Sequence, residues 1–157
     1  VFSYGTESFV KKAAECGMAG LILPDVPYEE KGEFEKACEK YGLELISLIA
    51  PTSRDRIEMI AKNAKGFIYC VSSLGVTGVR NSFSTDISDV TKHIKAASDI
   101  PCAIGFGIST PEQAKKMSVY SDGVIVGSAI VKIIAKYGKN CIEPVCSYVK
   151  EMKKAVS

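Results

Sequence analysis

Short apolar runs alternate along the chain with longer stretches in which apolar residues recur at helical spacing. Five of these runs are continuous and bounded by Gly, Pro or Asp, a pattern typical of parallel strands that are buried on both faces. The strands predicted in this way are residues 21–23, 45–49, 67–71, 102–104 and 124–126.

The stretches between the strands predict crossover helices with one apolar face. Residues 34, 37, 38 and 41 are apolar or aromatic at i, i+3, i+4 and i+7, and residues 57, 60, 61 and 64 repeat the spacing. Helices are predicted over residues 9–16, 34–41, 57–64, 86–97, 129–134 and 145–152, with Gly17 ending the first of them.

Five strands that alternate with helices predict either part of a closed barrel or an open doubly wound sheet. An eight-stranded β/α barrel needs about 250 residues, whereas this chain has 157. We therefore interpret residues 1–157 as a single domain, the C-terminal portion of a partial (β/α)8 TIM barrel with about five of the eight strands. The alternative is a flavodoxin-like open sheet, which is less favoured because that fold opens on a strand and this sequence opens on a helical stretch.

Composition narrows the class of partner. Twenty basic and eighteen acidic residues are interspersed and leave a net charge of +2, so no basic stripe suited to nucleic acid is present. No apolar run approaches the roughly 20 residues of a membrane-spanning helix, and the first residues do not resemble a signal peptide. We expect a cytoplasmic protein that binds neither nucleic acid nor a membrane.

Cysteine and histidine offer little metal chemistry. The six cysteines include no C-x-x-C pair, and His93 is the only histidine, so we expect no metal site and six reduced thiols. His93 lies on a predicted helix, away from the strand ends where barrel enzymes place their chemistry, and a helix-packing or surface role is expected for it.

Two consecutive strand ends carry the signature of a phosphate site. Gly105 and Gly107 follow one strand, and the sequence then predicts a helix start with Ser109 as N-cap and Glu112 completing a capping box. Gly127 and Ser128 follow the next strand and open another helix. Helix N-termini attract anions, and in β/α barrels the loops after the last two strands commonly hold a substrate phosphate.

The other strand ends offer fewer candidate functional residues. Asp25 follows the first strand, where it is either a turn and cap residue or a proton-transfer group. Residues 72–85 show no clear periodicity and are either a lid with Gly75 and Gly78 as hinges or a plain surface loop.

Four segments together resemble the tryptophan synthase α subunit family. They are residues 23–30 (LPDVPYEE), 75–78 (GVTG), 105–113 (GFGISTPEQ) and 127–132 (GSAIVK). The resemblance implies a carbon–carbon lyase of tryptophan biosynthesis, which cleaves indole-3-glycerol phosphate to indole and glyceraldehyde 3-phosphate by a retro-aldol step. It also implies a partner β subunit, which alone carries pyridoxal phosphate and receives the indole, so no cofactor is expected on this chain.

The resemblance assigns binding residues but no catalytic ones. The residues similar to the family's phosphate and lid positions are Thr77, Gly78, Gly107, Gly127 and Ser128, and those similar to its indole pocket are Ile22, Leu48, Tyr69 and Phe106. The family's catalytic Glu and Asp belong to a segment that this sequence lacks, so we expect the isolated chain to be inactive. We also expect it to associate with itself or with the missing N-terminal barrel half.

Two other functions are also compatible with the sequence. One is a non-catalytic remnant that binds phosphate or docks on a β subunit. The other is a different sugar-phosphate barrel enzyme, such as an epimerase or isomerase, although only Asp25 offers the strand-end carboxylate or histidine that such an enzyme requires.

Overall fold

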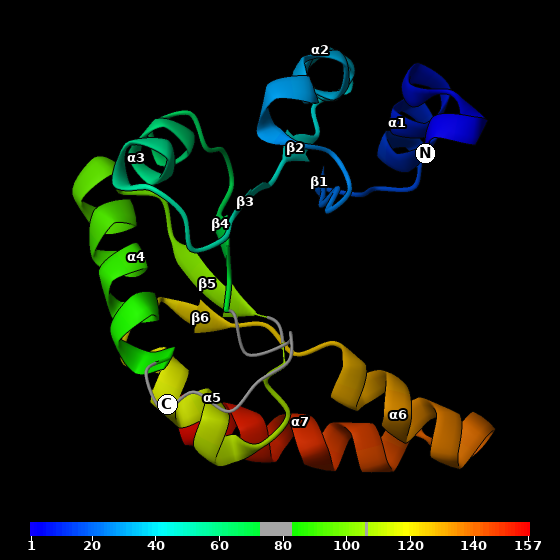
Figure 1. Cartoon of the computed structure of the whole chain (residues 1–157). Helices are drawn as coiled ribbons and strands as arrows, with labels where there is room; N and C mark the ends of the chain where they lie inside the picture. The colour runs from blue at the N-terminus through cyan, green and yellow to red at the C-terminus, as the bar shows by residue number, and fades with distance from the viewer. Residues whose placement is uncertain (73–82, 106) are drawn as a thin grey trace.

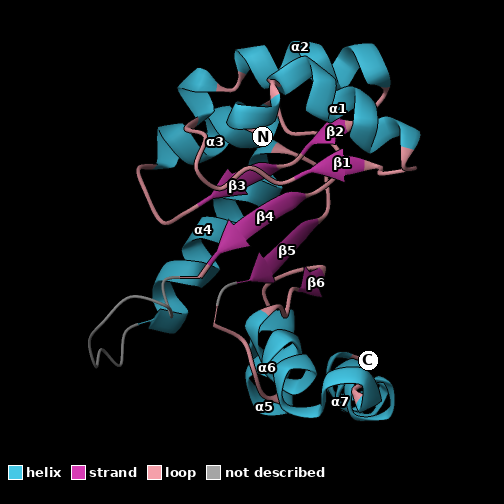
Figure 2. Cartoon of the chain, turned by 90° about the vertical axis from the view of Figure 1, so that its right-hand side faces the viewer, coloured by secondary structure: helices cyan, strands magenta, loops and turns pink. Residues whose placement is uncertain are grey.

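The chain folds into two parallel sheets, of two and four strands, which follow one arc with helices packed along its outer side (Figures 1 and 2). The computed structural model describes residues 1–72, 83–105 and 107–157, with side chains omitted at 83–86. Its strands are β1 (Gly20–Leu21), β2 (Glu44–Leu45), β3 (Ser47–Ile49), β4 (Ile68–Val71), β5 (Cys102–Gly105) and β6 (Gly123–Val124). Each pairs in parallel with the next in the order β1-β2 and β3-β4-β5-β6.

The strand predicted at 45–49 is divided at Ile46, which corrects the sequence interpretation. β2 pairs with β1 and β3 pairs with β4, so the chain changes partner between them. The Ile46 N–H still donates to the Leu21 carbonyl at 2.9 Å. This bond extends the β1-β2 pairing up to the residue at which the chain changes partner.

The sequential strand order decides between the two folds that the sequence left open. A doubly wound sheet places its first strand between later ones, whereas here every described pair joins neighbours along the sequence. Figure 1 shows an arc with its concave side uncovered, which is the wall of an incomplete barrel.

The predicted helices are present with bounds shifted by a few residues. They are α1 (Thr6–Glu15), α2 (Gly32–Tyr41), α3 (Arg54–Lys62), α4 (Phe83–Ala97), α5 (Pro111–Ser118), α6 (Ser128–Tyr137) and α7 (Ile142–Val156), with short 3-10 turns η1 (Phe2–Tyr4), η2 (Tyr28–Glu30) and η4 (Gly138–Asn140). Gly17 and Gly42 have φ of 76° and 72°, a left-handed conformation that suits a helix terminus. None of the helices described is long and apolar enough to cross a bilayer.

Side chains on the outer face of the sheet form the main core. Ile49, Ile68, Cys70, Cys102 and Ile104 are fully buried, against apolar residues of α3, α4 and α5. The hydrogen bond with Cys102 and burial raise the pKa of the Cys70 thiol, so it packs as a neutral apolar group. All six cysteines fall in the described residues, and none forms a disulfide. A smaller core joins α1, α2 and β1.

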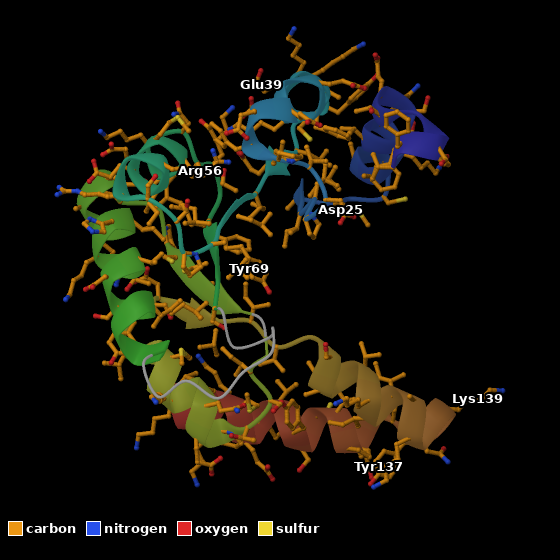
Figure 3. All side chains as sticks on the ribbon, in the orientation of Figure 1. Asp25, Glu39, Arg56, Tyr69, Tyr137 and Lys139 are labelled. Carbon is orange, nitrogen blue, oxygen red and sulfur yellow. The ribbon has the colours of Figure 1, made fainter. Side chains whose placement is uncertain are left out.

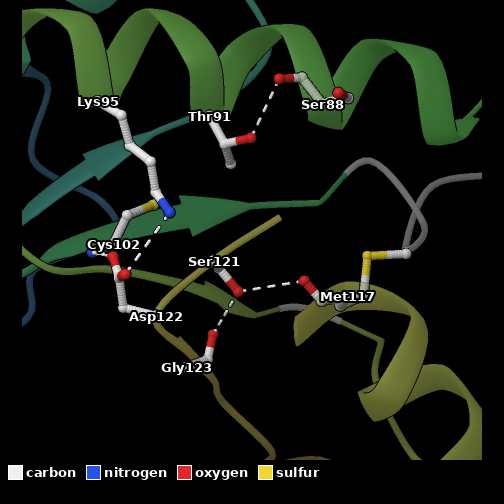
Figure 4. A network of polar contacts seen from close by, with 8 residues as sticks. All are labelled: Ser88, Thr91, Lys95, Cys102, Met117, Ser121, Asp122 and Gly123. Carbon is white, nitrogen blue, oxygen red and sulfur yellow. Dashed lines mark hydrogen bonds and ion pairs between the residues drawn. The ribbon is translucent and has the colours of Figure 1, made fainter. Parts of the chain in front are cut away.

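Polar contacts fasten the start of β5 to the start of β6 (Figure 4). The Asp122 Oδ2 atom accepts the Cys102 N–H at 2.9 Å, and Lys95 Nζ lies 3.5 Å from Asp122 Oδ1. The backbone hydrogen bond, with help from Lys95, lowers the pKa of Asp122. The Ser121 hydroxyl bonds the Gly123 carbonyl at 2.8 Å, so the chain enters β6 in a fixed position.

Exposed apolar side chains gather at the two ends of the arc. Among the described residues, five large ones lie in the first 22 positions and six lie between 119 and 149: Val1, Phe2, Tyr4, Met18 and Ile22, then Val119, Val131, Ile134, Tyr137, Ile142 and Val149. In the described sheet, β1 and β6 each pair along one side only. Unpaired strand edges and apolar patches favour association.

We predict that the isolated chain self-associates at micromolar concentration. Sedimentation velocity should show species larger than the 16.9 kDa monomer. A Val131→Asp variant should shift the distribution toward monomer, because it places a charge in the apolar surface of α6, while Met59→Asp, also at an exposed apolar position, should not. A single monomeric species in the unmodified chain would contradict this prediction.

Candidate functional site

A pocket of about 370 Å³ opens at the carboxyl ends of β4, β5 and β6. Its walls come from the strand ends, the turn before α5 and the first turns of α6. The lining residues are Tyr69, Gly107, Ile108, Ser109, Ile125, Gly127, Ser128, Ala129 and Lys132. Ligand sites of β/α folds lie at this end of the strands.

The first turn of α6 supplies the pocket with backbone donors. Gly127 is its N-cap, no side chain caps the helix, and its first turn contains no acidic residue. A Cβ placed on Gly127 would meet no described protein atom within 4 Å, so the space in front of this residue is open to a ligand. The helix N-terminus carries partial positive charge and favours an anion.

The N-terminus of α5 differs from the sequence prediction. Its N-cap is Thr110, and the capping box is completed by Gln113 instead of Ser109 with Glu112. Pro111 lacks an N–H and has the fixed φ suited to the first helical position, which makes the preceding residue the cap. The Ser109 and Thr110 N–H groups both donate to Gln113 Oε1, at 2.8 and 3.2 Å. These donors are therefore occupied, and α6 supplies the open ones.

Tyr69 stands on the inner face of the sheet, and Gly105 makes room for it. A Cβ on Gly105 would lie 2.5 Å from Tyr69 Cζ, and closer still to its hydroxyl. Figure 3 shows the Tyr69 side chain directed toward the open side of the arc. Burial raises the pKa of the Tyr69 phenol, so this side chain is a neutral wall of the pocket with a hydroxyl tip.

Two further hydrogen bonds hold the surrounding backbone. The Ser72 hydroxyl, buried at the end of β4, donates to the Gly105 carbonyl at 3.0 Å. The Tyr148 hydroxyl of α7 donates to the Ser109 carbonyl at 2.9 Å. The last helix thus fixes the turn that carries Gly107, a contact across 39 residues that the sequence pattern did not predict.

Four of the residues singled out from the sequence line this pocket together: Tyr69, Gly107, Gly127 and Ser128. Leu48 is the register neighbour of Tyr69 on the sheet but lines a separate small cavity near Tyr28. Ile22 follows β1 and is 42% exposed. Thr77, Gly78 and Phe106 lie outside the described residues.

Asp25 and His93 take no part in this pocket. Asp25 is an exposed residue of the turn after β1, nearer the N-terminal end of the arc than Tyr69 (Figure 3), and it is not among the residues that line this pocket. His93 lies on α4 with its Nδ1 atom 3.9 Å from Glu58 Oε1 of α3, the helix-packing position expected for it. Across the described residues, no group of three or more His, Cys, Asp and Glu is placed to hold a metal ion.

The sequence interpretation missed Ile108, Ile125 and Lys132 as pocket residues. Lys132 could have been predicted from the sequence, because position i+4 from Ser128 falls on the same face of a helix. Whether Ile108 and Ile125 line the pocket depends on how the chain turns after β5 and β6, and no local sequence pattern predicts those turns.

Comparison with known proteins settles the family. The profile of the tryptophan synthase alpha chain family matches residues 1–157. The chain belongs to this family. It is 48% identical to the tryptophan synthase alpha chain of Thermoanaerobacter sp. strain X514 over 158 aligned positions, which cover 99% of this chain and 60% of the relative.

Solved structures agree with the sequence match. The tryptophan synthase alpha subunit of Campylobacter jejuni superposes with a TM-score of 0.85 at 38% identity, covering 96% of this chain and 60% of that one. A chain of the tryptophan synthase α2β2 complex of Pyrococcus furiosus gives a TM-score of 0.83 at 30% identity, covering 98% of this chain and 62% of that one. The chain therefore spans about 60% of the length of its relatives and forms part of their barrel.

A Gly105→Ala variant should displace the Tyr69 ring and lower the free energy of unfolding by about 1 to 3 kcal/mol, because the added methyl group overpacks the inner face. Adding Tyr69→Ala should recover part of this loss, so the two changes should be non-additive in urea unfolding.

Gly123→Ala is the matched control for this pair, because its Cβ would lie at an ordinary 3.8 Å from Ala103 Cβ and should show no coupling to Tyr69. Additive effects of Gly105→Ala and Tyr69→Ala would show that the two positions do not contact each other.

Proposed function

We propose that this chain provides the phosphate-binding side and part of the indole pocket of a tryptophan synthase α subunit. The substrate is indole-3-glycerol phosphate, and the reaction is its retro-aldol cleavage to indole and glyceraldehyde 3-phosphate. The family match supports the reaction class, and the pocket supports the mode of binding.

One observation carries the proposal: Tyr69, Gly107, Gly127 and Ser128 share one pocket beside an uncapped helix N-terminus. A phosphate group needs several N–H donors and no bulky side chain in front of them. An indole ring needs a flat apolar wall, which the Tyr69 ring offers. Both requirements meet within one cavity of suitable size for a small ligand.

The chemical step needs groups that this pocket does not contain. Cleavage requires a proton at indole C3 and a base for the glycerol hydroxyl, work for two carboxylates with separated pKa values. No carboxylate is among the described residues that line the pocket. We propose that the catalytic Glu and Asp come from the part of the barrel that the relatives possess beyond this chain.

A relative offers evidence on the partner of this chain. The related structure from Pyrococcus furiosus is of an α2β2 complex. We propose a tryptophan synthase β subunit as the partner, with the indole product passing to it.

Binding of glycerol 3-phosphate tests the site. Gly127→Val should weaken its affinity about tenfold or more, because a side chain in front of the α6 N-terminus displaces hydrogen bonds to a charged group. Folding should be unaffected, since the added Cβ meets no described protein atom. The measurement is calorimetric titration of the unmodified chain and the variant.

His93→Ala serves as the control in this titration and should bind like the unmodified chain, because His93 lies between α3 and α4. Equal affinity for the Gly127→Val variant would show that the phosphate binds elsewhere.

An indole-release assay tests whether catalysis requires groups from outside this chain. We expect no measurable lyase activity from this chain alone, because each missing acid or base typically contributes about 10² to 10⁴ in rate. The assay follows indole formed from indole-3-glycerol phosphate, with a full-length α subunit as positive control. Turnover at an ordinary enzymatic rate would contradict the proposal and direct mutagenesis to Asp25.

A further inference from the structure

We infer that Lys132 is a further phosphate-binding residue of this site, providing the one full positive charge that the backbone donors lack. The inference rests on the proposed function and adds to it that the ligand is recognised as a dianion. It assigns a role to a side chain of α6 that lies within the GSAIVK segment but to which the resemblance gave none.

The position of Lys132 on α6 brings it to the pocket. It follows Ser128 by one helical turn, and residues at i and i+4 share a face of the helix. Both residues line the pocket with Gly127 and Ala129. Of the described residues around this cavity, Lys132 is the only charged one.

No described group neutralises the charge of Lys132. For the part of the chain that the structure describes, no ion pair or hydrogen bond involves the Lys132 side chain, and the first turn of α6 contains no acidic residue. Lys136, one turn further along, is placed differently: its Nζ lies 5.0 Å from the centre of the Tyr137 ring. Lys132 is exposed.

The charge has a defined physical effect on binding. A phosphate monoester carries close to two negative charges at neutral pH, and helix N–H groups offer only partial positive charge that acts at short range. A flexible ammonium group acts as a point charge that attracts the anion and balances part of its charge. Because the group is exposed, its contribution should fall as salt screens it.

The test compares Lys132→Met with Lys136→Met, two variants that lose the same charge from the same helix. Calorimetric titration with glycerol 3-phosphate at low salt should show about two- to fivefold weaker binding for Lys132→Met, the range of an exposed ion pair. The ratio of the two dissociation constants, Lys132→Met over the unmodified chain, should fall toward one near 1 M salt, where the screening length is about 3 Å. Lys136→Met should match the unmodified chain, and Lys132→Arg should retain the affinity and its salt dependence.

The outcomes separate this inference from the proposed function. If Gly127→Val weakens binding but Lys132→Met does not, the pocket binds phosphate without Lys132 and the inference is wrong. If Lys132→Met and Lys136→Met weaken binding equally, the effect is one of net charge and the inference is also wrong. Absence of binding to the unmodified chain would overturn both. Equal thermal unfolding midpoints of the variants exclude a folding defect as the cause.

Discussion

Parallel backbone pairing in sequence order is the constraint on which this structure depends. Since β3, β4, β5 and β6 all run the same way and each adjoins the next, their carboxyl ends meet at one edge. Turns separated by about 20 residues of chain, at Gly107 and Gly127, are thereby brought to one pocket. The buried outer row of the sheet holds this register against the helices, and Tyr69 of the inner row lines the pocket.

Two helix N-termini lie at this edge, and they are capped differently. Gln113 closes the start of α5 by accepting two backbone N–H groups, which makes that turn rigid. α6 starts at Gly127 with no such cap, so no side chain occupies the N–H groups of its first turn. Tyr148 ties the turn before α5 to α7, which holds this turn in place.

The fold followed from the sequence to a large extent because its signals are local. Buried parallel strands appear as continuous apolar runs, and Gly17 was predicted to end the first helix, where its φ of 76° suits a helix terminus. The division at Ile46 was missed because a change of strand partner leaves no trace in hydrophobicity. The cap of α5 was misassigned by one residue. Two overlapping capping patterns are present in the sequence, Ser109 with Glu112 and Thr110 with Gln113. The conformation at Pro111 decides for the second. Within the site, the glycine and serine positions were predictable, whereas Lys132 and Tyr148 required knowledge of which helix faces meet.

Backbone amide shifts measured by NMR during a titration with inorganic phosphate would test the central claim most directly. The account predicts that the amides of Gly107, Gly127, Ser128 and Ala129 shift together, while those of Ser109 and Thr110 change little because Gln113 already occupies them. Shifts centred on the α5 N-terminus, or on the surface around His93 and Arg54, would contradict it.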